Sequence, residues 1–123
     1  ARMSLYGEKI AEHAKHPRNQ GTLDDADAAH EGTNPLCGDR LRMQLKLAEG
    51  RIAQVRFHAE ACMVSIASAS ILSELLSGMT VAEARALPRE RLLQALETEL
   101  RPGRVGCALL PLQVAQGALE AAR

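Results

Sequence analysis

Hydrophobic and polar residues alternate along two neighbouring segments in the first half of the chain. Every second residue is apolar from Leu41 to Leu47, and again from Ala53 to Ala59. A period of two places every second side chain on the same face of a strand. Glu49-Gly50 lies between the segments and suits a two-residue turn, because glycine readily adopts positive φ. The pattern therefore predicts an antiparallel hairpin with one buried face and one solvated face.

Segments with the periodicity of a helix precede and follow this hairpin in the sequence. Ser4 can cap a first helix, and His16-Pro17 ends it, because the residue before a proline avoids helical geometry. Cys62 opens a second helix of small and apolar residues, which Gly78 ends. Thr80 and Glu83 form a capping-box pattern. The expected helices span residues 4–15, 62–77, 80–87, 88–100 and 107–122, with Pro111 in the first turn of the last one.

A short strand around residues 28–33 is the only further element for which the Gly-, Asp- and Asn-rich segment 17–36 has room. The order of elements is a helix, a small antiparallel sheet of about three strands, and then several helices. This order is typical of an α+β fold in which the helices pack against the sheet. The length of 123 residues suits one domain, so we expect residues 1–123 to form a single domain.

Composition narrows the classes of function. Fifteen basic and fifteen acidic residues cancel, and aromatic residues make up 2% of the chain, which argues against nucleic-acid binding. No apolar run approaches the roughly 20 residues that span a bilayer, so we expect no membrane association. The first fifteen residues lack the apolar block of a signal peptide. We therefore expect a cytoplasmic protein with free thiols.

Three cysteines carry the candidate chemistry. Cys37 begins a Cys-Gly-Asp sequence, Cys62 lies between the expected hairpin and the second helix, and Cys107 opens the expected last helix. Asp39 is two residues from Cys37, so in an extended segment both side chains point to the same side. Three cysteines cannot form a closed set of disulfides. The unpaired amides at a helix N-terminus stabilise a thiolate, as expected for Cys62 and Cys107.

Thiolates favour zinc and iron–sulfur clusters, and a carboxylate can complete a set of four ligands. The alternative for each cysteine alone is a small buried hydrophobic residue. Three cysteines at element boundaries, one beside Asp39, favour the metal site. The remaining polar residues are assigned structural positions: His58 on the solvated face of its strand, His13, His16 and His30 at the surface or in loops, and Ser65, Ser68 and Ser70 in helix packing.

Four blocks of the chain together resemble the scaffold family of iron–sulfur cluster assembly, which comprises IscU, the N-terminal domain of NifU, and SufU. Tyr6 through Gly21 is similar to the opening helix and Asn-Pro-Arg-Asn-x-Gly signature of the family. Cys37-Gly38-Asp39 matches its Cys-Gly-Asp motif, and residues 62–70 match its Cys-x-x-Ser-x-Ala-Ser-x-Ser segment. Cys107 falls where the third family cysteine belongs. The resemblance covers nearly the whole chain.

The resemblance implies a function and a set of ligands. Cys37, Cys62 and Cys107 would hold a transient [2Fe–2S] cluster, with Asp39 as a further ligand or as the group that keeps the cluster labile. Sulfur would arrive as persulfide from a cysteine desulfurase, with Cys37 and Cys107 as candidate acceptors, and the cluster would pass to recipient proteins. Apo forms of the family commonly hold Zn²⁺ in this pocket. The protein would be a scaffold and carrier, not an enzyme.

Two departures from the family pattern keep alternatives open. IscU has histidine before the third cysteine, where this chain has Gly106. In addition, residues 100–104 differ from the IscU segment that an Hsp70-type chaperone recognises, which argues against such a chaperone as a partner. SufU also lacks the histidine but carries an insertion for which this chain is too short. The alternative is a SufU-type zinc-dependent sulfurtransferase, with Cys37 accepting persulfide. A third interpretation is a family member that serves only as an interaction module.

Overall fold

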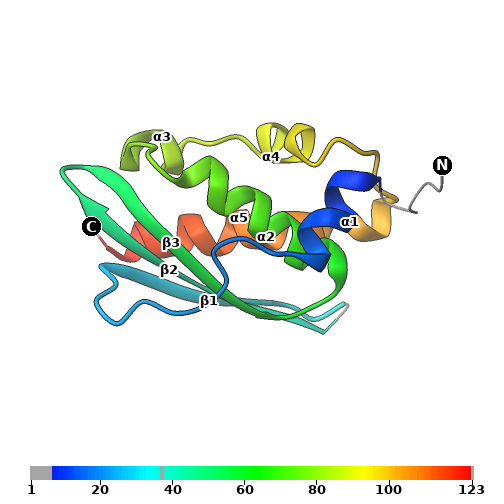
Figure 1. Ribbon diagram of the computed structural model, residues 1–123, viewed down its shortest axis with the longest axis horizontal. Coiled ribbons are helices and arrows are strands. Elements are labelled where there is room, and N and C mark those ends of the chain that lie inside the picture. The colour runs from blue at the N-terminus through cyan, green and yellow to red at the C-terminus, as the bar shows by residue number, and fades with distance from the viewer. Residues whose placement is uncertain (1–6, 37, 123) are drawn as a thin grey trace.

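A three-stranded antiparallel sheet and a layer of helices make up the protein (Figure 1). The computed structural model describes residues 7–36 and 38–122. The strands are β1 (Ala28–Asn34), β2 (Asp39–Ala48) and β3 (Arg51–Glu60), in the order β1-β2-β3. The predicted α+β fold is therefore confirmed, including the short strand in the polar segment.

The β2–β3 hairpin follows the predicted alternation with one exception. Leu41, Met43 and Leu45 are buried, and Glu49 and Gly50 both have positive φ (54° and 76°), as a tight hairpin turn requires. The sequence pattern placed Ala53 on the buried face, but Ile52 is buried there and Ala53 is exposed. The strand register shifts between Lys46 and Leu47, and such a bulge moves the side chains of one strand end to the other face.

Within the described residues, five helices lie on one side of the sheet (Figure 1). They are α1 (Glu8–Lys15), α2 (Met63–Leu76), α3 (Val81–Arg85), α4 (Arg89–Ala95) and α5 (Pro102–Ala121). Helix α5 packs on β1 and β2, while α2 packs between α5, α1 and β3. Figure 1 shows α3 and α4 on the side of α2 away from the sheet. The expected capping box at Thr80 is present and starts α3.

Three helix boundaries differ from the sequence prediction. Helix α1 begins at Glu8 after Gly7, whereas the expected cap Ser4 and the aromatic Tyr6 lie outside the described residues. Helix α4 ends at Ala95 instead of near residue 100, and Glu97 beyond it has positive φ. Helix α5 begins at Pro102 and not at Cys107, because proline is well suited to the first helical position.

The early start of α5 changes the position of Pro111 within it. Pro111 lies in the interior of the helix, not in its first turn. An interior proline lacks the N–H that would bond the carbonyl four residues earlier, which here is that of Cys107. The backbone oxygen of Cys107 therefore has to find its hydrogen bond outside the helix.

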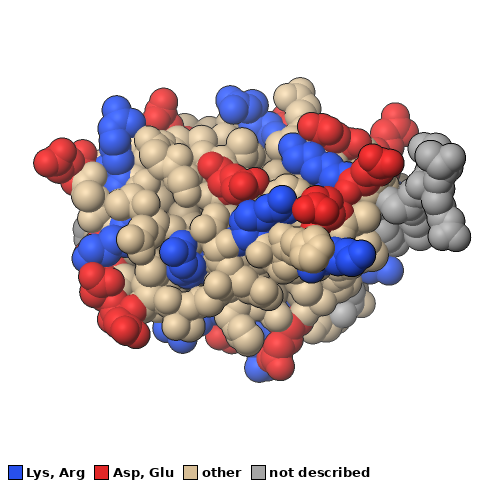
Figure 2. Space-filling model, viewed as in Figure 1, with Lys and Arg blue, Asp and Glu red and all other residues tan. Residues whose placement is uncertain are grey.

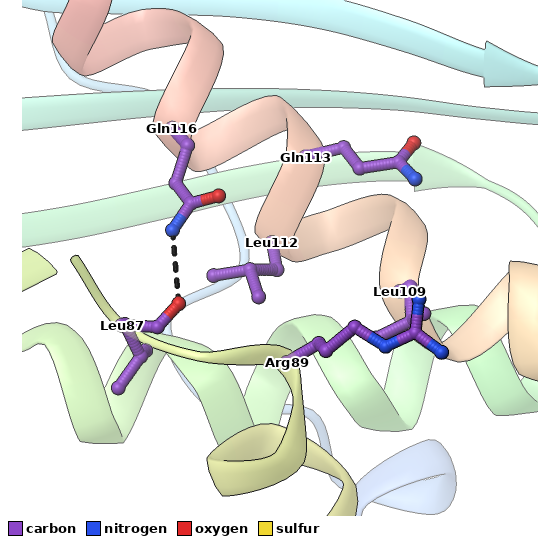
Figure 3. Close-up of a pocket in the computed structure, with 6 residues that line it drawn as sticks. All are labelled: Leu87, Arg89, Leu109, Leu112, Gln113 and Gln116. Carbon is purple, nitrogen blue, oxygen red and sulfur yellow. Dashed lines mark hydrogen bonds between the residues drawn. The ribbon is translucent and has the colours of Figure 1, made fainter. Parts of the chain in front are cut away.

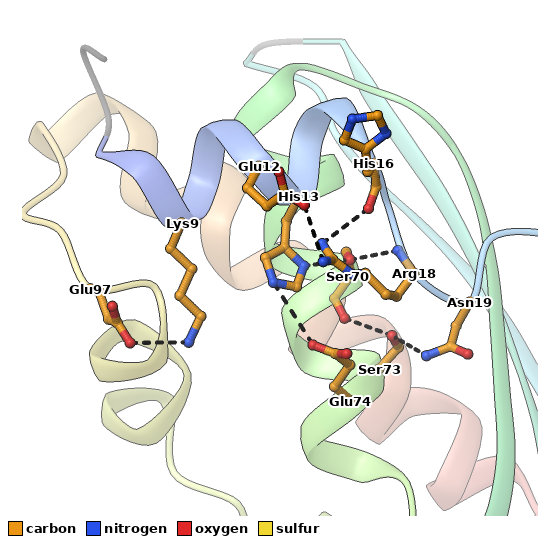
Figure 4. Close-up of polar contacts among 10 residues, drawn as sticks. All are labelled: Lys9, Glu12, His13, His16, Arg18, Asn19, Ser70, Ser73, Glu74 and Glu97. Carbon is orange, nitrogen blue, oxygen red and sulfur yellow. Dashed lines mark hydrogen bonds and ion pairs between the residues drawn. The ribbon is translucent and has the colours of Figure 1, made fainter. Parts of the chain in front are cut away.

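A buried histidine connects α1 to α2. His13 was expected at the surface, but it is 6% exposed, and its Nδ1 lies 2.7 Å from the Oγ of Ser70 (Figure 4). The Ser70 hydroxyl also accepts the backbone N–H of Arg18 at 2.8 Å. On the other side of the ring, Nε2 lies 3.8 Å from a carboxylate oxygen of Glu74. These bonds join the N-terminal helix and the following turn to the helix that begins beside Cys62.

Burial lowers the pKa of His13 below its ordinary value of 6.5, and the neighbouring Arg18 cation acts in the same direction, with Glu74 opposing it. The folded state therefore binds this proton less tightly than the unfolded state does. His13 contributes a stability that is complete above pH 6.5 and is lost as the pH falls below that value.

We expect the melting temperature of the metal-free protein to fall as the pH is lowered from about 7.5 to about 5.5, the range in which histidine titrates. His13→Gln should weaken this pH dependence, whereas His16→Gln, at an exposed position, should leave it unchanged. Thermal unfolding followed by circular dichroism at several pH values measures both. Equal slopes for the wild type and His13→Gln would show that another group carries the effect.

Candidate metal centre

Asp39 is a buried carboxylate at the first residue of β2. Asp39 is 2% exposed, and its Oδ1 accepts a hydrogen bond from the backbone N–H of Cys62 at 2.9 Å. A buried carboxylate is tolerated only where hydrogen bonds replace its hydration. Cys37, which the sequence predicts on the same side of the chain as Asp39, lies outside the described residues.

Cys62 lies where the sequence placed it, at the junction of β3 and α2. It is the N-cap residue of α2 and is partly exposed. Its Sγ lies 3.6 Å from Oδ2 of Asp39. The carboxylate of Asp39 thus contacts both the backbone N–H and the thiol of Cys62, which holds the start of β2 against the start of α2.

Cys107 reaches the same place from α5, although not from its N-terminus. Because α5 begins at Pro102, Cys107 occupies the second turn, and its side chain is completely buried. The expected stabilisation by first-turn amides is therefore absent at this cysteine. Its backbone carbonyl, to which Pro111 has no N–H to donate, accepts the Ser65 hydroxyl at 2.9 Å.

The three residues form one cluster of potential ligand atoms. The two Sγ atoms of Cys62 and Cys107 and a carboxylate oxygen of Asp39 all lie within 4.8 Å of one another. A sulfur and an oxygen bound to one tetrahedral zinc ion, at about 2.3 Å and about 2.1 Å, lie about 3.6 Å apart. Cys62 Sγ and Asp39 Oδ2 already have this separation of 3.6 Å. The donor set and its spacing fit a thiolate-binding cation such as Zn²⁺ or iron.

Ser65 is a member of this cluster that the sequence prediction did not include. Its hydroxyl lies in the first turn of α2, is fully buried, and donates to Asp39 Oδ2 at 2.7 Å. Ser68 fits the predicted packing role, because its hydroxyl donates to the carbonyl of Ala108 at 2.6 Å.

Asn34 fills the space beside Gly106. Its amide Nδ2 lies 3.9 Å from Cys107 Sγ, a long contact with a sulfur acceptor. A Cβ atom at position 106 would lie 3.3 Å from the same nitrogen. The absence of a side chain at Gly106 therefore leaves room for the amide of Asn34, the last residue of β1. The sequence pattern did not indicate this role of Asn34.

The histidines lie apart from the cluster. His58 is exposed on β3, as expected, and His16 and His30 are also exposed. Among the residues that the structure describes, the one group of at least three His, Cys, Asp or Glu side chains with ligand spacing contains no histidine. The described part of the site therefore offers sulfur and carboxylate ligands.

A separate hollow of about 230 Å³ lies between α5 and the link from α3 to α4 (Figure 3). It is lined by Leu87, Arg89, Leu109, Leu112, Gln113 and Gln116. Gln116 spans one side of it and donates to the carbonyl of Leu87 at 3.1 Å. Neither cysteine of the cluster lines this hollow, and its polar contacts serve to attach the α3–α4 link to α5.

The surface has no dominant sign of charge. Figure 2 shows acidic and basic side chains intermixed over the face in view, in keeping with fifteen residues of each sign. None of the helices within residues 7–36 and 38–122 combines the length and apolarity that crossing a membrane requires.

Comparison with protein families gives a match over almost the whole chain. The family described as the NifU-like N terminal domain matches residues 5–122. An iron-sulfur cluster assembly scaffold protein IscU of Haemophilus influenzae is 35% identical over 122 residues, which cover 95% of this chain and 91% of that protein. The iron-sulfur cluster assembly scaffold protein IscU 1 of Archaeoglobus fulgidus is 34% identical over 75% of this chain, and the match spans 60% of that relative's length.

Proteins named for SUF-type assembly are similar as well. The zinc-dependent sulfurtransferase SufU of Bacillus subtilis is 35% identical over 70% of this chain and 58% of its own length. The crystal structure of a putative iron-sulfur cluster assembly scaffold protein for the SUF system from Fervidobacterium islandicum aligns with a TM-score of 0.82 and 25% identity. That alignment covers 93% of this chain and 96% of the other.

The different burial of the two described thiols predicts different reactivity. In the metal-free folded protein we expect iodoacetamide to label Cys62 at least about 10-fold faster than Cys107, because Cys107 has to become exposed by local opening. Peptide mass spectrometry over a time course measures the two rates. Guanidinium should equalise them, and equal rates without denaturant would contradict the burial of Cys107.

Proposed function

This chain belongs to the NifU-like N-terminal domain family, and from that premise we propose that it is a scaffold on which iron–sulfur clusters are assembled. The observation that carries the proposal is the cluster of Asp39, Cys62 and Cys107, whose ligand atoms lie within 4.8 Å of one another. Relatives named IscU and described as assembly scaffolds support it.

The proposed ligands of a transient [2Fe–2S] cluster are Cys37, Asp39, Cys62 and Cys107. Thiolates bind iron strongly, and three of them are enough to retain it. A carboxylate is a harder ligand for iron than sulfur and exchanges more readily. Mixed ligation of this kind suits a protein that has to hold a cluster and then pass it to recipient proteins. The same donors suit Zn²⁺ when no cluster is being built.

Sulfur would be delivered by a cysteine desulfurase. A thiolate of the scaffold attacks the outer sulfur of the desulfurase persulfide, which forms a persulfide on the scaffold and releases the desulfurase thiolate. No net oxidation occurs in this transfer. A separate two-electron reduction by a thiol reductant then converts the transferred sulfur to sulfide. Of the two candidate acceptors, Cys107 is completely buried, which limits access to its sulfur and favours Cys37.

Anaerobic reconstitution with ferrous iron, cysteine, a thiol reductant and a cysteine desulfurase tests the scaffold. We expect a visible absorption spectrum and about two iron and two sulfide per chain, as a [2Fe–2S] cluster requires. Cys62→Ala should retain less than about a tenth of the cluster, because a thiolate ligand is lost, whereas His58→Ala, at an exposed position, should behave as the wild type. A colourless protein that holds only zinc under these conditions would overturn the proposal.

The second candidate function is a zinc-dependent sulfurtransferase. Two observations favour it: the relative of that name in Bacillus subtilis, and Gly106 beside Cys107, which provides no histidine ligand. Under this function zinc is retained, and Cys37 carries the sulfur.

Desulfurase turnover separates the two candidates. A sulfurtransferase should stimulate turnover about 10-fold or more when zinc-loaded, because a carrier thiol removes the persulfide that otherwise slows the desulfurase. With Cys37→Ala protein, turnover should equal that of the desulfurase alone. If zinc-loaded protein causes no stimulation, the transferase function is excluded and the scaffold is retained.

A further inference from the structure

We propose that Ser65 is a positioning residue that holds the Asp39 carboxylate ready to bind metal and lets it detach without disrupting the core. This inference rests on the proposed function, because it concerns the same set of ligands. Ser65 would not bind the metal itself. It would act through Asp39, and its effect would be seen in metal affinity.

The Ser65 hydroxyl contacts each of the three cluster residues that the structure describes. Its Oγ lies 2.7 Å from Asp39 Oδ2 and 2.9 Å from the backbone oxygen of Cys107. The Sγ of Cys62 lies 3.8 Å away. Ser65 is completely buried, so no solvent competes for these bonds. One hydroxyl thus joins β2, α2 and α5 at the point where the ligands converge.

Two donors among the described residues help to orient the Asp39 carboxylate. The Cys62 N–H binds Oδ1, and the Ser65 hydroxyl binds Oδ2. Oδ2 is the oxygen that lies 3.6 Å from Cys62 Sγ, the spacing of two ligands on one ion. A metal-bound carboxylate is usually held by such hydrogen bonds, and their removal typically weakens metal binding 10- to 100-fold.

A hydroxyl has one proton, and Ser65 has two oxygen acceptors for it. The second acceptor, the Cys107 carbonyl, is available because Pro111 has no N–H to offer it. When Asp39 turns away, the hydroxyl can donate fully to this carbonyl, so the buried Ser65 hydroxyl and the Cys107 carbonyl both keep a partner. Ser65 therefore orients Asp39 without making its detachment costly, which suits a ligand that exchanges.

Ser68 provides a matched control. It lies one turn further along α2, is also completely buried, and donates to the next carbonyl of α5, that of Ala108. It therefore makes the same kind of contact between α2 and α5 as Ser65 does. Its hydrogen bond goes to Ala108 and none to Asp39 is present. Any effect common to Ser65→Ala and Ser68→Ala reflects helix packing, and only their difference reports on Asp39.

The test uses Zn²⁺ as the probe, with affinity measured anaerobically by competition with a chromophoric chelator. We expect Ser65→Ala to weaken zinc binding by about 10-fold or more and Ser68→Ala by less than about 2-fold. Ser65→Thr, which keeps the hydroxyl, should restore most of the affinity. In the Asp39→Ala background, Ser65→Ala should add less than about 2-fold, because its effect passes through Asp39.

Two further measurements separate positioning from stability. Pro111→Ala restores an N–H for the Cys107 carbonyl, so Ser65→Ala/Pro111→Ala should be more stable than Ser65→Ala and still bind zinc as weakly. The Co²⁺ protein supplies a spectroscopic readout, and its visible bands should shift in Ser65→Ala but not in Ser68→Ala.

Equal losses for Ser65→Ala and Ser68→Ala would overturn the inference, as would an undiminished effect of Ser65→Ala in the Asp39→Ala background. Either result would leave the proposed function intact, because that function depends on cluster assembly on the four ligands and not on how Ser65 orients Asp39. A wild-type protein without measurable zinc or cobalt binding would overturn both the inference and the proposed function.

Discussion

The buried carboxylate of Asp39 is the constraint around which the site is built. A carboxylate that is 2% exposed needs hydrogen bonds to replace the water it has lost. The chain supplies them from the first turn of α2, through the N–H of Cys62 and the hydroxyl of Ser65. Satisfying one charged group therefore fixes the start of β2 against the start of α2, and this places Cys62 beside Asp39.

Helix α5 completes the arrangement through a defect in its own hydrogen bonding. Pro111 removes the donor that the Cys107 carbonyl would have in a regular helix, and Ser65 replaces it from α2. The contact between α2 and α5 in this region is thus polar, through Ser65 and Ser68, although most of the core around it is apolar. Cys107 is held by its backbone as well as by its burial.

The ligands of the site are held in two different ways, which bears on how readily each can exchange. Cys62 and Cys107 belong to helices that the core holds in place, whereas Asp39 is held by hydrogen bonds that can be redistributed. A site with two kinds of ligand attachment can keep its cysteines in position while one carboxylate comes and goes. Midway along α2, His13 and Ser70 join the N-terminal helix to the same element, so protonation of His13 acts on a contact of the helix that follows Cys62.

The sequence by itself determined the α+β fold, the hairpin, the identity of Cys62, Cys107 and Asp39 as candidate ligands, and the family. These follow from local periods and from short motifs, which need no knowledge of distant contacts. The bulge that buries Ile52, the burial of His13, and the roles of Ser65 and Asn34 were decided only by the tertiary structure. Each depends on residues far apart in the chain, such as Ser65 and Cys107, and the burial of a polar side chain is set by the partner that folding brings to it. The start of α5 depends on both levels: Pro102 is compatible with the end of one helix or the start of the next, and packing against the rest of the chain selects Pro102 as the first residue of α5.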